Sequence, residues 1–193
     1  RIATFITLPG TYYRQVFITD NAIYTRNASN PNNWSEWRAL GKPTYTIDIN
    51  GNGDFASILK ALSAYNTNAR FIIKKGVYDI AKEYKNLYGS TYFDNYPGYR
   101  DSTNVMDRGL FLGDGVELIG QGRVELVFSY TGENENVRNY FSVLNTSQNN
   151  IIRNVDVTIT DGSCRYLIHD DFANDGGTNI IKNVTCTGHS YLG

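Results

Sequence analysis

A six-residue segment recurs almost unchanged in the last third of the chain. Asn150-Ile-Ile-Arg-Asn-Val155 returns 29 residues later as Asn179-Ile-Ile-Lys-Asn-Val184, and a partial copy precedes both at 116–120. A repeat of roughly 20 to 30 residues, made of short strands with Asn and Gly at the corners, is typical of a parallel β-solenoid. Because one repeat cannot bury its own hydrophobic side, we expect each repeat to stack on the next.

Alternate residues after each copy of the repeat are apolar. Val155, Val157 and Ile159 follow the first copy, and Val184 and Cys186 follow the second. Since alternate side chains of a strand share one face, these residues are predicted to point into the core, Cys186 included. The only other cysteine is Cys164, so the pattern indicates neither a disulfide framework nor a metal site.

Length and charge limit the class of protein. The 193 residues suffice for one large domain, or a medium domain with a small module. The 18 basic and 19 acidic side chains give a net charge of −1, which argues against nucleic acid and anionic membrane surfaces as partners. No apolar run approaches the roughly 18 residues of a membrane span, so no membrane insertion is expected. No sequence pattern indicates a cofactor.

Residues 1–42 are predicted to form a small β-rich module. The segments 13–18 and 22–26 are β-branched or aromatic and are separated by Thr19-Asp20-Asn21, which indicates a hairpin. Trp34 and Trp37 follow. A module this small has little interior, so we interpret the tryptophans as its core, with an exposed binding pair as the alternative.

Gly41-Lys42-Pro43 marks the predicted boundary with a second domain, 43–193. There we expect strands at 45–49 and 70–74, and a helix over 55–65 with Asp54 as its N-cap. The stretch 83–108 shows no steady period and is predicted to be a long loop, a feature that is uncommon unless it is functional. The chain stops directly after a strand-like segment, so we expect it to be a piece of a longer protein whose further C-terminal repeats are missing.

The segment 48–54 matches the first half of an EF-hand loop. Position twelve of that loop is Leu59, where bidentate Ca²⁺ coordination needs Glu. A turn leading into a helix cap is therefore favoured over a calcium site, and no metal is predicted.

The sequence from Ile49 to Ile58, with Ala61-Leu62 and the segment 71–78, resembles the start of the pectin lyase-like right-handed parallel β-helices. In that family a short helix caps the open end of the solenoid and an I-x-G-x-G element follows; here Leu118-Ile-Gly-Gln-Gly122 occupies that place. The resemblance covers roughly 43–193 and implies an all-β fold: a right-handed parallel β-helix with a capping helix. It implies no particular chemistry, because esterases, lyases, hydrolases and non-enzymatic phage tailspikes share this beginning. The later motifs of the pectin methylesterases are not present.

Residues 1–42 are similar to the small knob modules of phage tail fibres and pyocin-like particles, in which an Ile-Tyr-Thr-Arg strand, here Ile23 to Arg26, precedes Trp-x-x-Trp. A knob followed by a β-helix resembles the phage tail receptor-binding proteins. That resemblance implies a homotrimer with side-by-side solenoids on the virion. Its partners would be other phage tail or baseplate proteins and a bacterial surface polysaccharide.

The densest group of reactive side chains lies at 165–171. Strand alternation predicts Tyr166, Ile168 and Asp170 on one face and the other residues, including His169 and Asp171, on the opposite face. Paired carboxylates in a surface groove could act as general acid and base on a glycosidic bond, which makes His169, Asp170 and Asp171 candidate catalytic residues. Glycan binding or a polar subunit interface is the favoured alternative.

Tyrosines are frequent in the predicted loop. Tyrosine offers a broad, rigid contact for a sugar ring, so Tyr88, Tyr92, Tyr96 and the later Tyr166 are candidate carbohydrate-binding residues. Tyr84 and Tyr99 belong to the same series. The alternative is that these rings pack the loop onto the solenoid or between subunits.

Two functions remain open from the sequence. The first is a virion protein of a phage tail fibre or tailspike that attaches to host polysaccharide. The second is a polysaccharide-degrading enzyme of the same fold: a depolymerase, glycoside hydrolase or lyase. We expect no cleavage by this chain.

Overall fold

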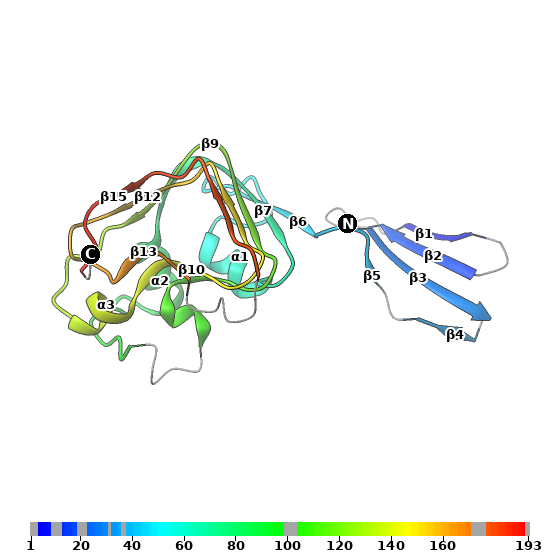
Figure 1. The fold of residues 1–193 in the computed structure, drawn as a ribbon, viewed down its shortest axis with the longest axis horizontal. Coiled ribbons are helices and arrows are strands. Elements are labelled where there is room, and N and C mark those ends of the chain that lie inside the picture. Colours follow the sequence, from blue (N-terminus) through cyan, green and yellow to red (C-terminus); the bar gives the residue numbers. More distant parts are fainter. Residues whose placement is uncertain are drawn as a thin grey trace. The chain divides into compact units, whose positions relative to one another are not determined.

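A computed structural model of the chain describes residues 4–8, 13–18, 23–30, 32–35, 38–98, 104–170 and 177–191. The chain divides into two compact units, 1–45 and 46–193. Most of the regular structure in the described residues is β-strand and the helices are few and short, so the fold is all-β (Figure 1).

The smaller unit contains an antiparallel sheet. Its strands are β1 (Thr4–Leu8), β2 (Tyr13–Ile18), β3 (Ile23–Asn30), β4 (Asn33–Trp34) and β5 (Arg38–Ala39). The predicted hairpin is confirmed: β2 and β3 pair from Tyr13 with Ala28 to Ile18 with Ile23. The sequence did not predict β1, which pairs with β2.

Of the two tryptophans in the smaller unit, only Trp34 lies within the described residues. Trp34 is half-buried and the Arg26 guanidinium carbon lies 4.9 Å from the centre of its ring, a cation–π contact. Trp37 lies outside the described residues. The described ring therefore packs against a neighbouring strand and is neither deeply buried nor fully exposed.

Parallel ladders make up the larger unit. Its strands are β6 (Thr44–Ile47), which begins at the unit boundary, β7 (Arg70–Asp79), β8 (Leu110–Leu112), β9 (Glu117–Phe128), β10 (Ser142–Thr146), β11 (Ile151–Arg153), β12 (Asp156–Ile159), β13 (Tyr166–Asp170), β14 (Ile180–Lys182) and β15 (Cys186–Thr187). One ladder has the order β13-β10-β8. The other has the order β14-β11-β9-β12-β15, with β7 pairing with both β9 and β6.

The two copies of the repeat lie side by side in register. Ile151 pairs with Ile180 and Arg153 with Lys182 in β11 and β14, and the partial copy in β9 pairs with β11 on its other side. β9 also pairs with β12, so this one long strand stacks on two strands of the next pass of the chain. The predicted stacking of the repeat is confirmed.

Asparagines form the corners between these strands. Asn154 and Asn183 follow β11 and β14 with φ of 55° and 53°, a region that Asn tolerates better than most residues. The Asn183 side-chain amide donates to Asn154 Oδ1 at 3.1 Å. At the same corner one pass earlier, a Cβ on Gly120 would lie 2.0 Å from the Asn154 carbonyl oxygen, so only glycine fits.

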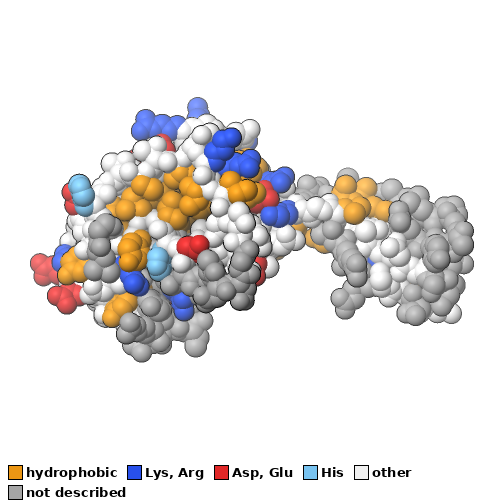
Figure 2. Space-filling view, in the orientation of Figure 1, with side chains coloured by type: hydrophobic (Ala, Val, Ile, Leu, Met, Phe, Trp, Pro, Cys, Tyr) orange, Lys and Arg blue, Asp and Glu red, His pale blue; other side chains and the backbone are white. Residues whose placement is uncertain are grey.

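Apolar side chains from both ladders fill the interior. Fully buried examples are Phe71, Leu110, Leu118, Leu126, Leu144, Ile152, Val155 and Val157. Ile159 is also buried, as predicted, but Cys186 is exposed and that prediction was wrong. Among the described strands β15 pairs only with β12, so nothing covers its other side. Hydrophobic side chains are visible on this unit in Figure 2, and Ile180 and Ile181 of β14 are among the exposed ones.

Helix α1 (Ile58–Ala64) starts later than the sequence predicted. Ser57 is its N-cap and accepts a hydrogen bond from the Lys60 amide, so the assignment of Asp54 as cap was wrong. Asp54 instead accepts from the Thr46 amide at 2.8 Å, which holds the 48–54 turn onto β6. Ile58, Leu59, Ala61 and Leu62 form the buried face of α1.

The predicted loop 83–108 is partly helical. Helix α2 (Ile80–Tyr88) covers its first residues, η2 (Val105–Arg108) is a 3₁₀ turn near its end, and α3 (Glu135–Tyr140) comes later in the chain. Asp79 caps α2 and Ile80, Ala81 and Tyr84 are its buried residues. Helix α2 was not predicted, because polar residues outnumber the apolar residues of its short buried stripe.

Glu83 of α2 connects this helix to α1. Its carboxylate accepts from the Ser57 hydroxyl at 2.6 Å and from the Leu59 amide at 2.8 Å, at the N-terminus of α1. Burial raises the pKa of Glu83 above its usual value, although these hydrogen bonds act in the opposite direction.

Candidate functional site

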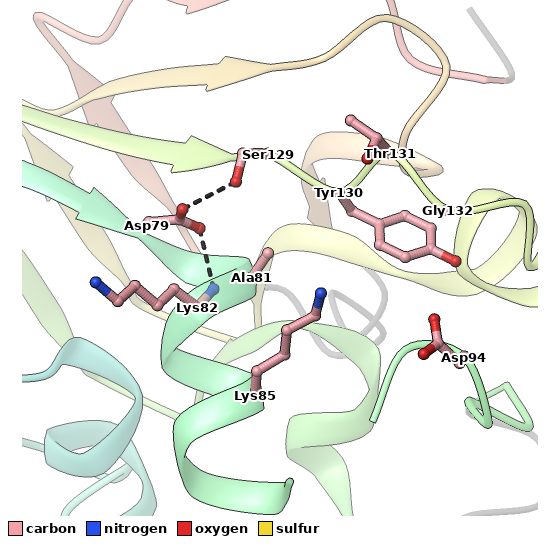
Figure 3. A pocket seen from close by; sticks show the side chains of 9 residues that line it. All are labelled: Asp79, Ala81, Lys82, Lys85, Asp94, Ser129, Tyr130, Thr131 and Gly132. Carbon is pink, nitrogen blue, oxygen red and sulfur yellow. Dashed lines mark hydrogen bonds between the residues drawn. The ribbon is translucent and has the colours of Figure 1, made fainter. Parts of the chain in front are cut away.

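An open pocket of about 450 Å³ lies between α2 and the residues that follow β9. Figure 3 shows its lining, which we call the α2 pocket: Asp79, Ala81, Lys82, Lys85, Asp94, Ser129, Tyr130, Thr131 and Gly132. The pocket exists because β7 and β9 run in parallel and end together, so that α2 and the 129–132 segment leave the ladder side by side.

One wall of the α2 pocket is fixed by Asp79. Its Oδ1 accepts from the Lys82 amide at 3.0 Å, and its Oδ2 accepts from the Ser129 hydroxyl at 2.9 Å (Figure 3). Asp79 thus caps α2 and ties it to the end of β9. Both of its oxygens are engaged, so Asp79 has a structural role in the pocket.

Other charged groups of the pocket are not paired. Within the described part of the chain, neither the ammonium groups of Lys82 and Lys85 nor the Asp94 carboxylate has a side-chain hydrogen bond or ion pair. In Figure 3 the Lys85 ammonium points toward Tyr130, whereas the Lys82 ammonium points away from it. The pocket therefore offers a strong donor and a strong acceptor to a ligand.

Next to the pocket lies an aromatic cluster that packs the 84–96 segment onto the ladders: Tyr84, Tyr88, Tyr92, Phe93, Tyr96, Phe128, Tyr130 and Phe141. Tyr84 is fully buried and its hydroxyl donates to the Met106 carbonyl at 2.6 Å. Burial raises the pKa of Tyr84 well above its usual value, so the hydroxyl stays protonated and remains a donor.

The candidate sugar-binding tyrosines of this segment differ in exposure. Tyr96 is 1% exposed and its hydroxyl donates to the Asp107 carbonyl. Tyr92 is half-buried and its hydroxyl donates to Asp107 Oδ1 at 2.6 Å. Burial is the main cause that raises the pKa of Tyr92, and the hydrogen bond to Asp107 is the second cause. Tyr88 is 39% exposed and stacks on Tyr92 with ring centres 5.2 Å apart. Of these three rings, Tyr88 offers the most surface to solvent, and Tyr99 lies outside the described residues.

Two of the candidate catalytic residues, His169 and Asp170, lie on β13, far along the chain from the α2 pocket. Asp170 is exposed and its Oδ2 accepts from the Asn179 side chain at 3.3 Å, while Asp171 lies outside the described residues. The Tyr166 and His169 rings stack with centres 4.6 Å apart. This contact brings together two side chains that strict alternation predicted on opposite faces of the strand.

Other chemistry finds little support in the described residues. No group of three or more His, Cys, Asp or Glu side chains is placed there to hold a metal ion. Asp48 in the EF-hand-like turn accepts from the Asn50 amide at 2.9 Å. Burial raises the pKa of the Cys164 thiol to about 12, which keeps it neutral and a poor nucleophile. No helix in the described ranges is long and apolar enough to cross a membrane.

Comparisons with known proteins add no relative. No protein-family model matches the chain, and neither a curated protein nor a solved structure matches it with significant similarity.

The α2 pocket was not predicted from the sequence. The available signal was Asp79 followed by apolar residues at 80, 81 and 84, which fits an N-cap and a short helix with Lys82 and Lys85 on its other side. No local pattern could have brought Asp94 or Tyr130 to that helix, because they reach it through tertiary packing.

Proposed function

We propose that the larger unit is the first part of a right-handed parallel β-helix with α1 as its capping helix. Three features support this proposal: the parallel ladders, the repeat that stacks in register, and the long strands β7 and β9 that each contribute to two stretches of ladder. A short helix with one fully apolar side at the start of such a stack is suited to cover its open end.

We propose further that the protein belongs to a phage tail fibre or tailspike and attaches the virion to a bacterial surface polysaccharide. The observation that carries this proposal is the order of the two units: a small antiparallel module directly precedes the parallel ladders in one chain. The open polar α2 pocket is compatible with a sugar ligand.

Attachment is tested with fluorescently labelled protein and bacterial cells from a strain panel. We expect the protein to adsorb to some strains and to lose adsorption when periodate oxidises the surface polysaccharide. A protease treatment of the cells that leaves the glycans intact serves as the matched control. Adsorption that survives periodate but not protease would contradict the proposal and identify a protein receptor instead.

The proposed assembly is a homotrimer that also contacts other tail or baseplate proteins. A slender stack of ladders exposes long faces that can be buried between identical subunits. Light scattering should give three times the chain mass of 21.7 kDa at micromolar concentration. A stable monomer under these conditions would count against the trimer.

A polysaccharide-degrading enzyme is the second candidate, favoured by the exposed Asp170 carboxylate next to the stacked Tyr166 and His169 rings. Changing Asp170 and Asp171 together to Asn removes two proton-transfer groups but leaves acceptor oxygens for sugar binding. If a glycosidase or lyase site lies here, cleavage should fall about 10²–10⁴-fold while binding persists. The assay is reducing-end release from purified surface polysaccharide, and we expect no cleavage by either form.

A further inference from the structure

We propose that the α2 pocket is a saccharide-binding site in which the Lys85 ammonium and the Asp94 carboxylate bind neighbouring hydroxyls of one sugar ring. This inference rests on the proposed function, because it names the place where polysaccharide recognition occurs. It differs from the sites that the sequence predicted on β13 and on the exposed tyrosines.

Size and composition of the pocket suit a sugar. Its volume of about 450 Å³ lies within the range of small-molecule sites, which runs from about 300 to 1,000 Å³. Of its charged lining groups, the Lys85 ammonium and the Asp94 carboxylate are left for a ligand, one positive and one negative. Both Asp79 oxygens already accept hydrogen bonds, and the Lys82 ammonium points away from Tyr130. A balanced lining does not favour a strongly anionic or cationic ligand. It favours a neutral ligand that both donates and accepts hydrogen bonds.

Lys85 and Asp94 supply the two halves of such recognition. An ammonium group only donates and an ionised carboxylate only accepts, whereas each sugar hydroxyl does both. The two side chains come from different segments and are not paired with each other or with other described side chains (Figure 3). Neighbouring hydroxyls on one ring can therefore bridge them through charge-assisted hydrogen bonds.

The segment that carries Asp94 is held in place before any ligand binds. The Asn134 side-chain amide donates to the carbonyls of Phe93, Asp94 and Tyr96, at 2.8, 3.2 and 3.1 Å. The Asn134 backbone N–H in turn donates to the Tyr130 hydroxyl at 3.1 Å. Because this network is already formed, binding does not have to order the 93–96 segment.

The opposite wall is equally constrained. Tyr130 is 4% exposed, and a Cβ on Gly132 would lie 2.3 Å from its hydroxyl oxygen, so the chain must carry glycine at 132 to pass so close. On the other side, the Asp79–Ser129 hydrogen bond fixes α2 to the end of β9. The pocket is a preformed cavity with its free polar groups aimed across it.

The test measures binding of simple sugars by saturation-transfer NMR. The probes are the methyl glycosides of glucose, galactose, mannose and rhamnose, and N-acetylglucosamine, each added at millimolar concentration to the intact chain. We expect transfer to at least one of these probes. Lys85→Met and Asp94→Leu should each weaken that binding at least about tenfold, because each removes a charged hydrogen-bond partner.

Lys82→Met is the matched control on the same helix. Lys82 belongs to the pocket lining, but its ammonium points away from Tyr130, on the opposite side from the Lys85 ammonium. Its removal should therefore change affinity by less than about twofold. Lys82, Lys85 and Asp94 are all exposed, so every variant is expected to fold. Circular dichroism checks this.

Three results would overturn the inference: no transfer to any probe, binding unchanged in both Lys85→Met and Asp94→Leu, or an equal loss in Lys82→Met. These results are independent of the cell-adsorption experiment. Adsorption that survives in a Lys85→Met/Asp94→Leu double variant would place glycan recognition elsewhere and leave the attachment function standing. Sugar binding in the pocket without adsorption to any strain would do the reverse.

Discussion

The two units of the chain hold their strands together in different ways. In the smaller unit, β2 and β3 pair antiparallel across a short connection, and Ala28 and Tyr45 are the only buried hydrophobic residues among those whose side chains are described. In the larger unit, parallel pairs join strands tens of residues apart around a fully buried interior. Local pairing needs little chain and gives little core, whereas distant pairing must be stabilised by a large core.

The largest expected effect tests the core of the larger unit. Tyr84→Ala should destabilise it by about 3–5 kcal/mol, because a fully buried ring in the aromatic cluster is removed. Calorimetry should show a large downward shift of one transition, with the transition of the smaller unit unchanged.

Two variants at the same cluster serve as controls for Tyr84→Ala. Tyr84→Phe keeps the ring and removes only the hydroxyl bond to Met106, at a cost of about 1–2 kcal/mol. Tyr88→Ala should cost still less, because its ring is 39% exposed. Equal losses in all of these variants would mean that the cluster does not form the core described here.

A smaller effect is expected in the smaller unit. Trp34→Ala should cost about 2 kcal/mol, from a half-buried ring and its contact with Arg26. With so little core, this loss should unfold the smaller unit while the larger unit keeps its far-UV and near-UV signals. If the Trp34→Ala variant keeps a native near-UV signal from Trp37 and loses only glycan binding, the two tryptophans form an exposed binding pair instead.

The smallest expected effect concerns pH. The pKa of Glu83 is raised in the folded protein, so the folded state holds the proton more tightly than the unfolded chain does. This group therefore makes the folded protein more stable at low pH, and that contribution is lost as pH rises from the usual value of 4.5 through the raised folded pKa.

Glu83→Gln separates this effect from the others. Gln does not titrate, so the variant should lose that part of the pH dependence of unfolding free energy, at less than about 1.4 kcal/mol per pH unit. Urea unfolding of both forms at several pH values measures it. Identical pH profiles would show that Glu83 has the same pKa in both states.

The sequence determined much of the ladder architecture. The repeat at 150–155 and 179–184 predicted stacking, and the apolar alternation at Val155, Val157 and Ile159 predicted the buried face, because strand geometry turns a period of two into two faces. The same rule failed at Cys186. A residue pattern does not say whether another element covers the open side of an end strand. At β8, an end strand, Leu110 and Leu112 are fully buried, whereas at β15 Cys186 is exposed.

Only the tertiary structure decided the site. Asp79 and Ser129 are far apart in the chain and meet because β7 and β9 pair in parallel and end together. Asp94 reaches the same pocket because the Asn134 side chain holds the 93–96 segment. The tyrosines show the same limit: the sequence could not tell sugar-binding rings from packed rings, and the fold buries Tyr96 while leaving Tyr88 exposed. Local sequence sets which elements form and which face of each is apolar. Packing of the whole unit decides which side chains from separate parts of the sequence lie close together.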